Sequence, residues 1–264
     1  MGQGYAPRRG YFTMSDFASL VILSYNRKDF LRRSLESLWA NTDSEYELIV
    51  VDDASNAETQ EYIFSLVRQK KVSTALFNVG WNRGIGIAVN RGVAASRGNI
   101  LFKLDADLLY HPGWLREARR LLTIQKIGCL GLFRYNYPPC RWQDELNRTD
   151  PEGFDEVKDF VGSAIGFRRE MYDRFGPWTE EGWTFSEDVK KKKEIQAGGY
   201  LLALPKDDLA VNFGFGENLT SLIRKIDWKG GKHEYNIPVT APLLFGGAAQ
   251  TPPDNKECAD LRRL

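Results

Sequence analysis

Cysteine and histidine are scarce in this chain of 264 residues, which has three of the first and two of the second. Cys129, Cys140 and Cys258 are odd in number, lie far apart and lack the close spacing of a metal site. This usage excludes a fold held together by disulfides and indicates a reducing compartment. We therefore expect a cytoplasmic protein.

Long hydrophobic runs and an excess of charge of one sign are absent as well. No apolar run approaches the roughly 18 residues of a membrane span, so we expect neither a transmembrane segment nor a signal peptide. The formal net charge is +1, which argues against nucleic acid as a partner bound by bulk electrostatics. With 42% hydrophobic residues, the chain can form one large domain, or one domain with a modest appendage.

The most informative feature present is an apolar strand pattern over 100–104 that ends in two acids, Asp105 and Asp107. Burying an unpaired carboxylate costs several kcal/mol, so acids at the end of a buried strand need compensation. A divalent cation with oxygen ligands, bridging to a substrate phosphate, would supply it. A solvated turn rich in aspartate is the alternative that these residues alone leave open.

Strand and helix patterns alternate along the first half of the chain. Alternation of this kind predicts an α/β fold with a mostly parallel central sheet, right-handed crossovers and helices on both faces. The expected strands cover 18–24, 47–51, 72–77, 100–104 and 127–133, and the expected helices follow Arg27, cover 58–68 and 84–95, and begin near Pro112.

Polar side chains follow three of these predicted strands. They are Ser24, Tyr25 and Asn26 after the first, Asp52 and Asp53 after the second, and Asp105 and Asp107 after the fourth. In sheets of this type, ligands bind beyond the carboxyl ends of the strands, near the point where strand order reverses. The sequence therefore predicts a binding site at this edge.

The pattern changes after residue 134. We expect a long irregular excursion over 135–156, a strand within 157–167, helices over 168–175 and 187–197, and a last strand over 200–204. Beyond Asn212 no period is evident, and residues 1–16 show none either. We interpret these two ends as a C-terminal extension (213–264) and a flexible N-terminal arm.

Five ordered motifs make the chain resemble family 2 glycosyltransferases of the GT-A fold, a single Rossmann-like domain. They are Val21–Arg27, Val50–Ser55, Asn78–Gly80 with Asn90–Gly92, Asp105–Asp107, and Ser186–Asp188. The resemblance implies a GT-A domain over 17–212, with a nucleotide-binding half over about 17–110 and an acceptor-binding half over about 111–212.

The resemblance also implies a nucleotide-diphosphate sugar as donor. Asp53 would accept a hydrogen bond from the base, commonly the N3–H of uracil, which favours a UDP-sugar. Asp105 would bind the ribose hydroxyls, and a cationic side chain would lie near the diphosphate. The expected donor contacts are Leu23, Ser24, Tyr25, Arg27, Asp53, Asn78, Arg83 and Asp105. Asp53 as a turn former and Arg83 as a solvated residue remain alternatives.

Asp107 would anchor Mn²⁺ or Mg²⁺ on the diphosphate in proteins of this kind. Family members often add a histidine ligand after the last strand of the sheet, and here that position is Asn212. An amide oxygen can bind a hard cation, but less strongly than an ionised group. This departure puts the metal affinity of the site in doubt.

The acidic pair Glu187 and Asp188 matches the source of the family's general base, and the resemblance assigns the base to Asp188. A single displacement with one base inverts the anomeric configuration. Helix capping is the structural alternative for these acids. On the acceptor side, Trp178, Trp183 and Phe185 would stack on sugar, or serve as ordinary packing.

The lysine run 190–193 indicates a solvated helix face, or a surface that attracts an anionic acceptor or a membrane. The acceptor itself, a glycan, a lipid-linked molecule or a protein, is not encoded in a readable motif. Peripheral membrane contact is compatible with the run.

Three other functional hypotheses compete with sugar transfer. A sugar-nucleotide nucleotidyltransferase would need a glycine-rich phosphate loop after the first strand, where 25–29 has no glycine. A dehydrogenase is suggested only by Gly84 and Gly86, which lack the third glycine of the dinucleotide fingerprint. A catalytically inactive carbohydrate-binding relative would not require both the Asp105–Asp107 pair and Asp188.

Overall fold

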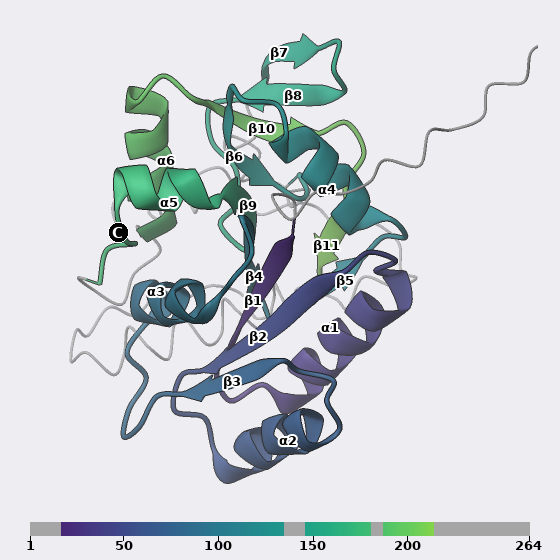
Figure 1. Cartoon of the computed structure of the whole chain (residues 1–264), viewed down its shortest axis with the longest axis vertical. Helices are drawn as coiled ribbons and strands as arrows, with labels where there is room; N and C mark the ends of the chain where they lie inside the picture. Colours follow the sequence, from purple (N-terminus) through teal and green to yellow (C-terminus); the bar gives the residue numbers. More distant parts are fainter. Residues whose placement is uncertain (1–16, 135–145, 181–186, 214–264) are drawn as a thin grey trace, which may run out of the picture.

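The computed structural model describes residues 17–134, 146–180 and 187–213. They form a nine-stranded sheet in the order β3-β2-β1-β4-β9-β6-β10-β8-β7, beside a two-stranded sheet of β11 and β5 (Figure 1). The strands are β1 (Ala18–Ser24), β2 (Tyr46–Asp52), β3 (Thr74–Phe77), β4 (Ile100–Asp105), β5 (Leu108–Tyr110), β6 (Ile127–Gly131), β7 (Leu146–Asp150), β8 (Phe154–Val157), β9 (Ala164–Arg168), β10 (Leu201–Pro205) and β11 (Ala210–Asn212). The helices are α1 (Lys28–Asn41), α2 (Ala57–Arg68), α3 (Ile85–Ala95), α4 (Trp114–Leu122), α5 (Arg169–Phe175) and α6 (Glu187–Ala197).

The large sheet is mostly parallel, as the alternation predicted. β1 pairs in parallel with β2 and β4, and β2 pairs in parallel with β3. β9 and β8 run against their neighbours, while the other strands of this sheet all point the same way. The chain leaves β1 towards β2 and β3 and returns to its other side as β4, so the strand order reverses at the carboxyl ends of β1 and β4.

Helices cover both faces of the sheet, with α1, α2 and α4 on one side and α3, α5 and α6 on the other (Figure 1). The alternation of strand side chains assigns the faces: Leu20 and Ile22 of β1 pack with α1, and Val21 packs with α3. Each such fully buried side chain stabilises the fold by about 1.5–3 kcal/mol. A Cβ at Gly92 would lie 2.2 Å from Val21 Cγ1, so α3 can approach β1 this closely only with glycine there.

Three features of the fold differ from the sequence-based expectation. The predicted irregular excursion over 135–156 contains β7, and β8 begins within it, because β7 pairs with β8 and β8 pairs with β10. The strand expected within 157–167 is β9, which begins only at Ala164. β5 and β11 were not predicted, since three residues are too few to show a period.

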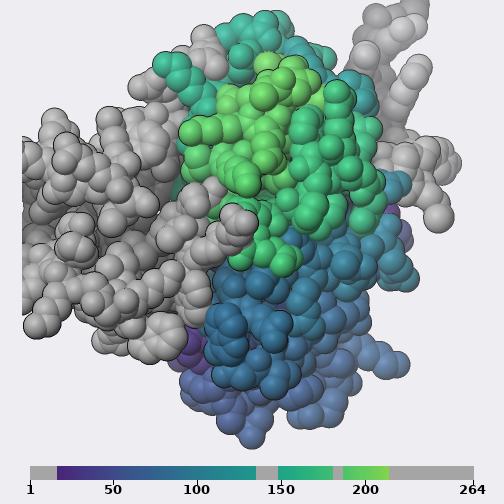
Figure 2. Space-filling view, turned by 90° about the vertical axis from the view of Figure 1, so that its left-hand side faces the viewer, coloured from purple at the N-terminus to yellow at the C-terminus, as the bar shows by residue number. Residues whose placement is uncertain are grey.

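The two halves of the chain pack against each other in one body, with the N-terminal half in blue below and the C-terminal half in green above (Figure 2). In the ranges that the structure describes, no helix has the length and apolarity needed to cross a bilayer. The predicted N-terminal arm, and the predicted C-terminal extension beyond Phe213, lie outside the described residues.

Candidate active site

A buried ion pair lies where the strand order reverses. Arg27 follows β1 and Asp107 follows β4, and Arg27 Nη1 lies 2.9 Å from Asp107 Oδ2. The Asp107 side chain is 2% exposed and that of Arg27 is 20% exposed. The Arg27 guanidinium also lies over the ring of Phe30, 4.9 Å from its centroid. The structure therefore joins two predicted site residues that are 80 positions apart in the chain.

The small sheet brings Asn212 to the same carboxylate. β11 pairs antiparallel with β5, placing Asn212 opposite Leu108, and the Asn212 amide donates to Asp107 Oδ1 at 2.9 Å. The backbone N–H of Phe213 donates to the Asp107 carbonyl at 3.0 Å. The two predicted metal ligands, Asp107 and Asn212, thus lie side by side, and the pairing of two three-residue strands is what brings them together.

A carboxylate and an amide oxygen are donor types that Mn²⁺ and Mg²⁺ accept. Asp107 offers the first directly, whereas Asn212, whose Nδ2 faces Asp107, would offer the second once its amide group is turned round. Within the described ranges, no group of three or more His, Cys, Asp or Glu residues could hold a metal ion. A cation here would need further oxygens from a diphosphate and water. Arg27 already holds one oxygen of Asp107.

Asp105 is held by a lysine from its own strand. Lys103 Nζ donates to Asp105 Oδ1 at 2.5 Å and to the Gly162 carbonyl at 2.7 Å. Burial lowers the pKa of Lys103, but the charges of Asp105, Glu187 and Asp188 outweigh burial and leave that pKa above its usual value. Sequence reasoning missed Lys103, although a charged residue inside an apolar strand is itself an anomaly.

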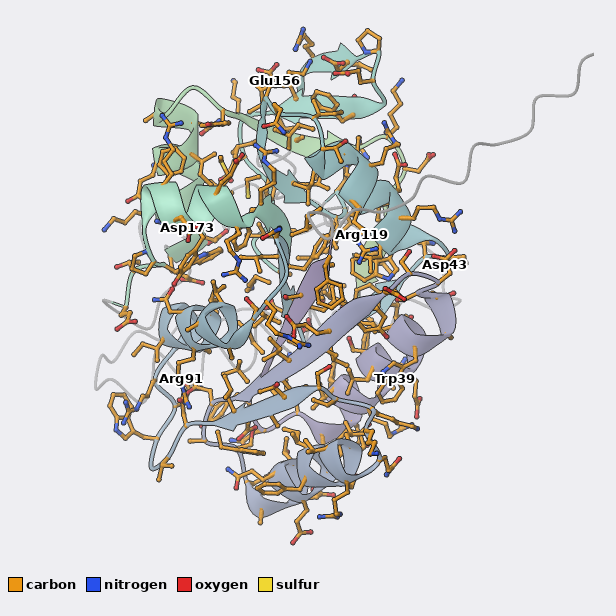
Figure 3. The ribbon with its side chains drawn as sticks, viewed as in Figure 1. Trp39, Asp43, Arg91, Arg119, Glu156 and Asp173 are labelled. Atoms are coloured by element: carbon orange, nitrogen blue, oxygen red, sulfur yellow. The ribbon has the colours of Figure 1, made fainter. Side chains whose placement is uncertain are left out.

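Asp53 anchors the turn that leads into α3. Its carboxylate accepts from Asn78 Nδ2 at 2.6 Å and from the backbone N–H groups of Arg83 and Gly84, both at 2.8 Å. Arg91, which is labelled in Figure 3, in turn donates to Asn78 Oδ1 and to the Phe77 carbonyl. A carboxylate has about four acceptor positions, so Asp53 keeps capacity for one further donor. The Arg83 side chain is exposed.

The turns after β1 and β2 are tied together by Asn26. Its backbone N–H donates to Ser55 Oγ at 2.9 Å, and its side-chain oxygen accepts from the Asn56 N–H at 2.7 Å. Asn26 has a φ of +51°, a left-handed conformation that asparagine adopts more readily than most residues. Asn26 belongs to the first sequence motif, but the sequence alone gave it no individual role.

The three residues expected to form the nucleobase pocket differ in access. Tyr25 is exposed and Leu23 is partly buried, whereas the Ser24 side chain is buried. The Ser24 carbonyl accepts from the Asp53 N–H at 2.8 Å. Ser24 therefore positions Asp53 through its backbone.

The acidic pair begins α6, and both of its members are buried. Asp188 Oδ2 lies 3.0 Å from Lys192 Nζ, and the same ammonium group contacts Asp159 and the Phe160 carbonyl. Gly162 lies directly against this acid, since a Cβ added there would stand 2.3 Å from Asp188 Oδ2.

The titration of Glu187 is shifted by its surroundings. Burial, followed by the negative charge of Asp188, raises the pKa of Glu187 to about 7. The nearby Lys103 opposes this shift without cancelling it. Glu187 is therefore protonated over a range in which an ordinary glutamate is ionised.

Only two of the four lysines in the run on α6 lie on a solvated face, which corrects the expectation for the other two. Lys191 and Lys192 are buried, whereas Lys190 and Lys193 are exposed. Lys191 Nζ donates to the Phe175 carbonyl at 2.7 Å. Both side chains point into the protein, because Lys191 faces the end of α5 and Lys192 faces the 159–162 segment.

Comparison with known proteins decides the family. The sequence profile described as "Glycosyl transferase family 2" matches residues 19–176. The glycosyltransferase AglE of Haloferax volcanii is 34% identical over 223 residues, covering 79% of this chain and 71% of AglE. The chain belongs to glycosyl transferase family 2. An uncharacterized glycosyltransferase, alr2836 of Nostoc, is 35% identical over 184 residues, and the match covers 64% of this chain but only 56% of that protein.

Solved structures confirm the GT-A fold of this family 2 chain. The mannosyltransferase PcManGT of Pyrobaculum calidifontis, solved with GDP-Man and Mn²⁺, superposes with a TM-score of 0.61 at 18% identity, covering 86% of this chain and 67% of that one. S. aureus TarS 1-349 with UDP-GlcNAc gives a TM-score of 0.57 at 16% identity, covering 73% and 57%.

In this family 2 chain, the motif residue Asn90 holds α3 to the segment after α5. Its Nδ2 donates to the Trp178 carbonyl at 2.9 Å and to Glu180 Oε1 at 3.0 Å, and its Oδ1 accepts from the Trp178 N–H at 2.8 Å. A Cβ at Gly86 would lie 2.0 Å from the Thr179 carbonyl oxygen. This close packing accounts for the glycine that had suggested a dinucleotide motif.

The predicted aromatic platform is placed only in part. Trp178 is buried beside Phe167, so it serves packing, the alternative considered from the sequence. Trp183, Phe185 and Ser186 lie outside the described residues. Of the predicted site, the structure thus groups Arg27, Asp107 and Asn212, groups Asp53, Asn78 and the Arg83 backbone, and places Asp105 beside the acidic pair through Lys103.

Proposed function

We propose that the protein transfers a sugar from a nucleotide-diphosphate sugar to an acceptor hydroxyl, with inversion at the anomeric carbon. One observation carries the proposal: Asp105, at the end of β4, and Asp188, at the start of α6, are both linked to Gly162, the first of them through Lys103. The Gly162 carbonyl binds the lysine that holds Asp105, and its Cα lies against Asp188. A donor bound at one side of this segment and an acceptor at the other would place their reacting atoms between the two groups of acids.

On the donor side, we assign recognition of the base to the remaining acceptor position of Asp53, with uracil as the favoured base. Asp105 would bind the ribose, and Asn78, which donates to Asp53, would contact the donor beside it. Leu23, Tyr25 and the Ser24 backbone would form the wall of the base pocket. The exposed guanidinium of Arg83 is free to approach a diphosphate, to which it can give two parallel hydrogen bonds.

A divalent cation, Mn²⁺ or Mg²⁺, would be held by Asp107 with the amide oxygen of Asn212. When bound, such a cation neutralises the charge that grows on a departing diphosphate. PcManGT and GalNAc-T7, two proteins of similar fold, were both solved with Mn²⁺, which supports this choice of metal.

On the acceptor side, Asp188 would act as the general base. The acceptor oxygen attacks the anomeric carbon, the bond from that carbon to the diphosphate oxygen breaks, and the acceptor proton passes to the Asp188 carboxylate. The nucleoside diphosphate leaves. Lys192, 3.0 Å from Asp188 Oδ2, keeps this buried carboxylate oriented and electrically compensated.

The decisive experiment is a screen of UDP- and GDP-sugars for hydrolysis and transfer, with and without Mn²⁺, followed by proton NMR of the product. We expect an anomeric configuration opposite to that of the donor. Asp188→Asn should reduce turnover by about 10²–10⁴-fold, the range for general base catalysis, while donor affinity stays the same.

Retention of configuration would overturn the single displacement. Near-normal turnover of Asp188→Asn would instead move the base to Glu187. Release of pyrophosphate from a nucleoside triphosphate and a sugar phosphate would favour a nucleotidyltransferase. Binding of sugars without any turnover would favour an inactive carbohydrate-binding relative. Acceptor screens with glycans, lipid-linked sugars and proteins would then define the second substrate.

A further inference from the structure

The ion pair of Arg27 with Asp107 places a cation of the protein where the proposed metal would bind. Resting on the proposed function, we infer that Arg27 is an exchangeable counterion. It compensates Asp107 in the donor-free protein, and it transfers to the diphosphate when the donor brings a divalent cation to that carboxylate.

The first step of the argument is the environment of Asp107. Its side chain is almost completely buried, and an unpaired carboxylate in that position would be strongly disfavoured. Asn212 supplies a hydrogen bond to Oδ1 but no charge. Among the residues that the structure describes, Arg27 brings a positive charge within hydrogen-bond distance of Oδ2. Asp107 therefore needs no metal ion in order to be buried.

The second step is competition. A divalent cation needs a lone pair of Asp107, and a guanidinium at 2.9 Å occupies one oxygen and repels a second positive charge. Metal binding without donor should therefore be weak. A diphosphate changes this balance, because its oxygens accept the planar fork of an arginine in two parallel bonds.

The third step is the position of Arg27 at the beginning of α1. It is the N-cap residue of this 14-residue helix, and its side chain makes no capping hydrogen bond. The positive end of the helix dipole favours an anion at the same place. Arg27 keeps partial exposure and a contact with the face of Phe30, which stacks on Phe213 with ring centroids 5.3 Å apart. Contact with a ring face does not fix the orientation of the guanidinium, so Arg27 can exchange the Asp107 carboxylate for a diphosphate as its hydrogen-bond acceptor.

The test measures Mn²⁺ binding to the full chain by electron paramagnetic resonance without nucleotide. Arg27→Gln should bind Mn²⁺ more tightly than the wild type, by a factor within the roughly 5- to 150-fold range of coupled sites. Calorimetry without metal should show weaker UDP binding by the same variant and unchanged binding of uridine, which has no phosphate.

Arg32→Gln is the matched control. It removes the same charge from the same helix, but Arg32 pairs with Asp29 and Glu36 rather than with Asp107. It should bind Mn²⁺ and UDP as the wild type does. Asp107→Asn in the Arg27→Gln background should abolish the gain in Mn²⁺ binding, which locates the ion at Asp107.

Equal or weaker Mn²⁺ binding by Arg27→Gln would overturn the exchange, as would a gain of the same size in Arg32→Gln. If Arg27→Gln does not fold, Arg27→Lys keeps the charge without the fork, and it should retain weak Mn²⁺ binding but lose UDP affinity. An Arg27→Lys variant that binds UDP as tightly as the wild type would also refute the inference. Failure of the wild type to bind any nucleoside diphosphate would refute the proposed donor, while the Mn²⁺ comparison would still report the competition for Asp107.

Discussion

Gly162→Ala tests the arrangement at the centre of the proposed site. The added Cβ would stand 2.3 Å from Asp188 Oδ2 and 2.6 Å from Asp188 Cγ, both well inside the 3.4 Å at which ordinary contact begins. Asp188 cannot simply retreat, because its Oδ2 is bound to Lys192 at 3.0 Å. Either the carboxylate or the segment must move by about 1 Å, and a misplacement of that size can reduce turnover by about 10²-fold.

The assay is single-turnover transfer, with donor affinity and thermal unfolding measured in parallel. We expect slower transfer by a folded protein, with a loss of stability of about 1–3 kcal/mol from overpacking. The sharper measurement is a double-mutant cycle with Asp188→Asn. Asparagine keeps the shape of the side chain but accepts no proton, so adding Gly162→Ala should then cost little further rate.

Additive losses in the cycle would show that Gly162→Ala acts somewhere other than on the base. Normal turnover of the single variant would refute the assignment more directly, because the clash is with the carboxylate itself. A loss confined to donor affinity would instead implicate Lys103, which the Gly162 carbonyl also binds.

Three further predictions follow from individual side chains. Asp53→Ala should weaken UDP binding by about 1–3 kcal/mol, and calorimetry showing equal affinity of the wild type for all nucleoside diphosphates would refute base recognition. Asn90→Ala should lower the free energy of unfolding in urea by about 1–3 kcal/mol, since it removes the bonds to Trp178 and Glu180; an unchanged unfolding midpoint would contradict this. The pKa of Glu187 is raised from 4.5 to about 7, so its contribution to stability is complete below pH 4.5 and is lost as the pH rises to about 7. Glu187→Gln should flatten this decline in the free energy of unfolding with pH. A variant whose pH profile runs parallel to that of the wild type would refute the contribution of Glu187.

Each acid of the proposed catalytic machinery has a cation from the same chain. Arg27 pairs with Asp107, Lys103 with Asp105, and Lys192 with Asp188. Removing one partner of such a buried pair leaves an uncompensated charge, which is more costly than the pair itself. These cations therefore belong to the site as much as the acids do, although sequence reasoning gave a role to Arg27 alone.

Local sequence determined the first half of the fold. β1, β2 and β4 are runs of six or seven residues with nearly continuous burial, and the helices between them show a helical period. Such periods belong to continuous stretches of chain, so they can be recognised before any long-range contact is known. The parallel alternation then places Tyr25, Asp53 and Asp105 at one edge of the sheet.

Tertiary structure alone decided which groups meet. Asn212 reaches Asp107 only because β11 pairs with β5, and each of these strands is too short to show a period. Gly162 joins the lysine of Asp105 to Asp188, and burial of Lys192 turns an apparently solvated run into an internal counterion. The physical reason is that a charge finds its partner through strand order and burial. These depend on contacts between residues as many as 105 positions apart, which no local pattern contains.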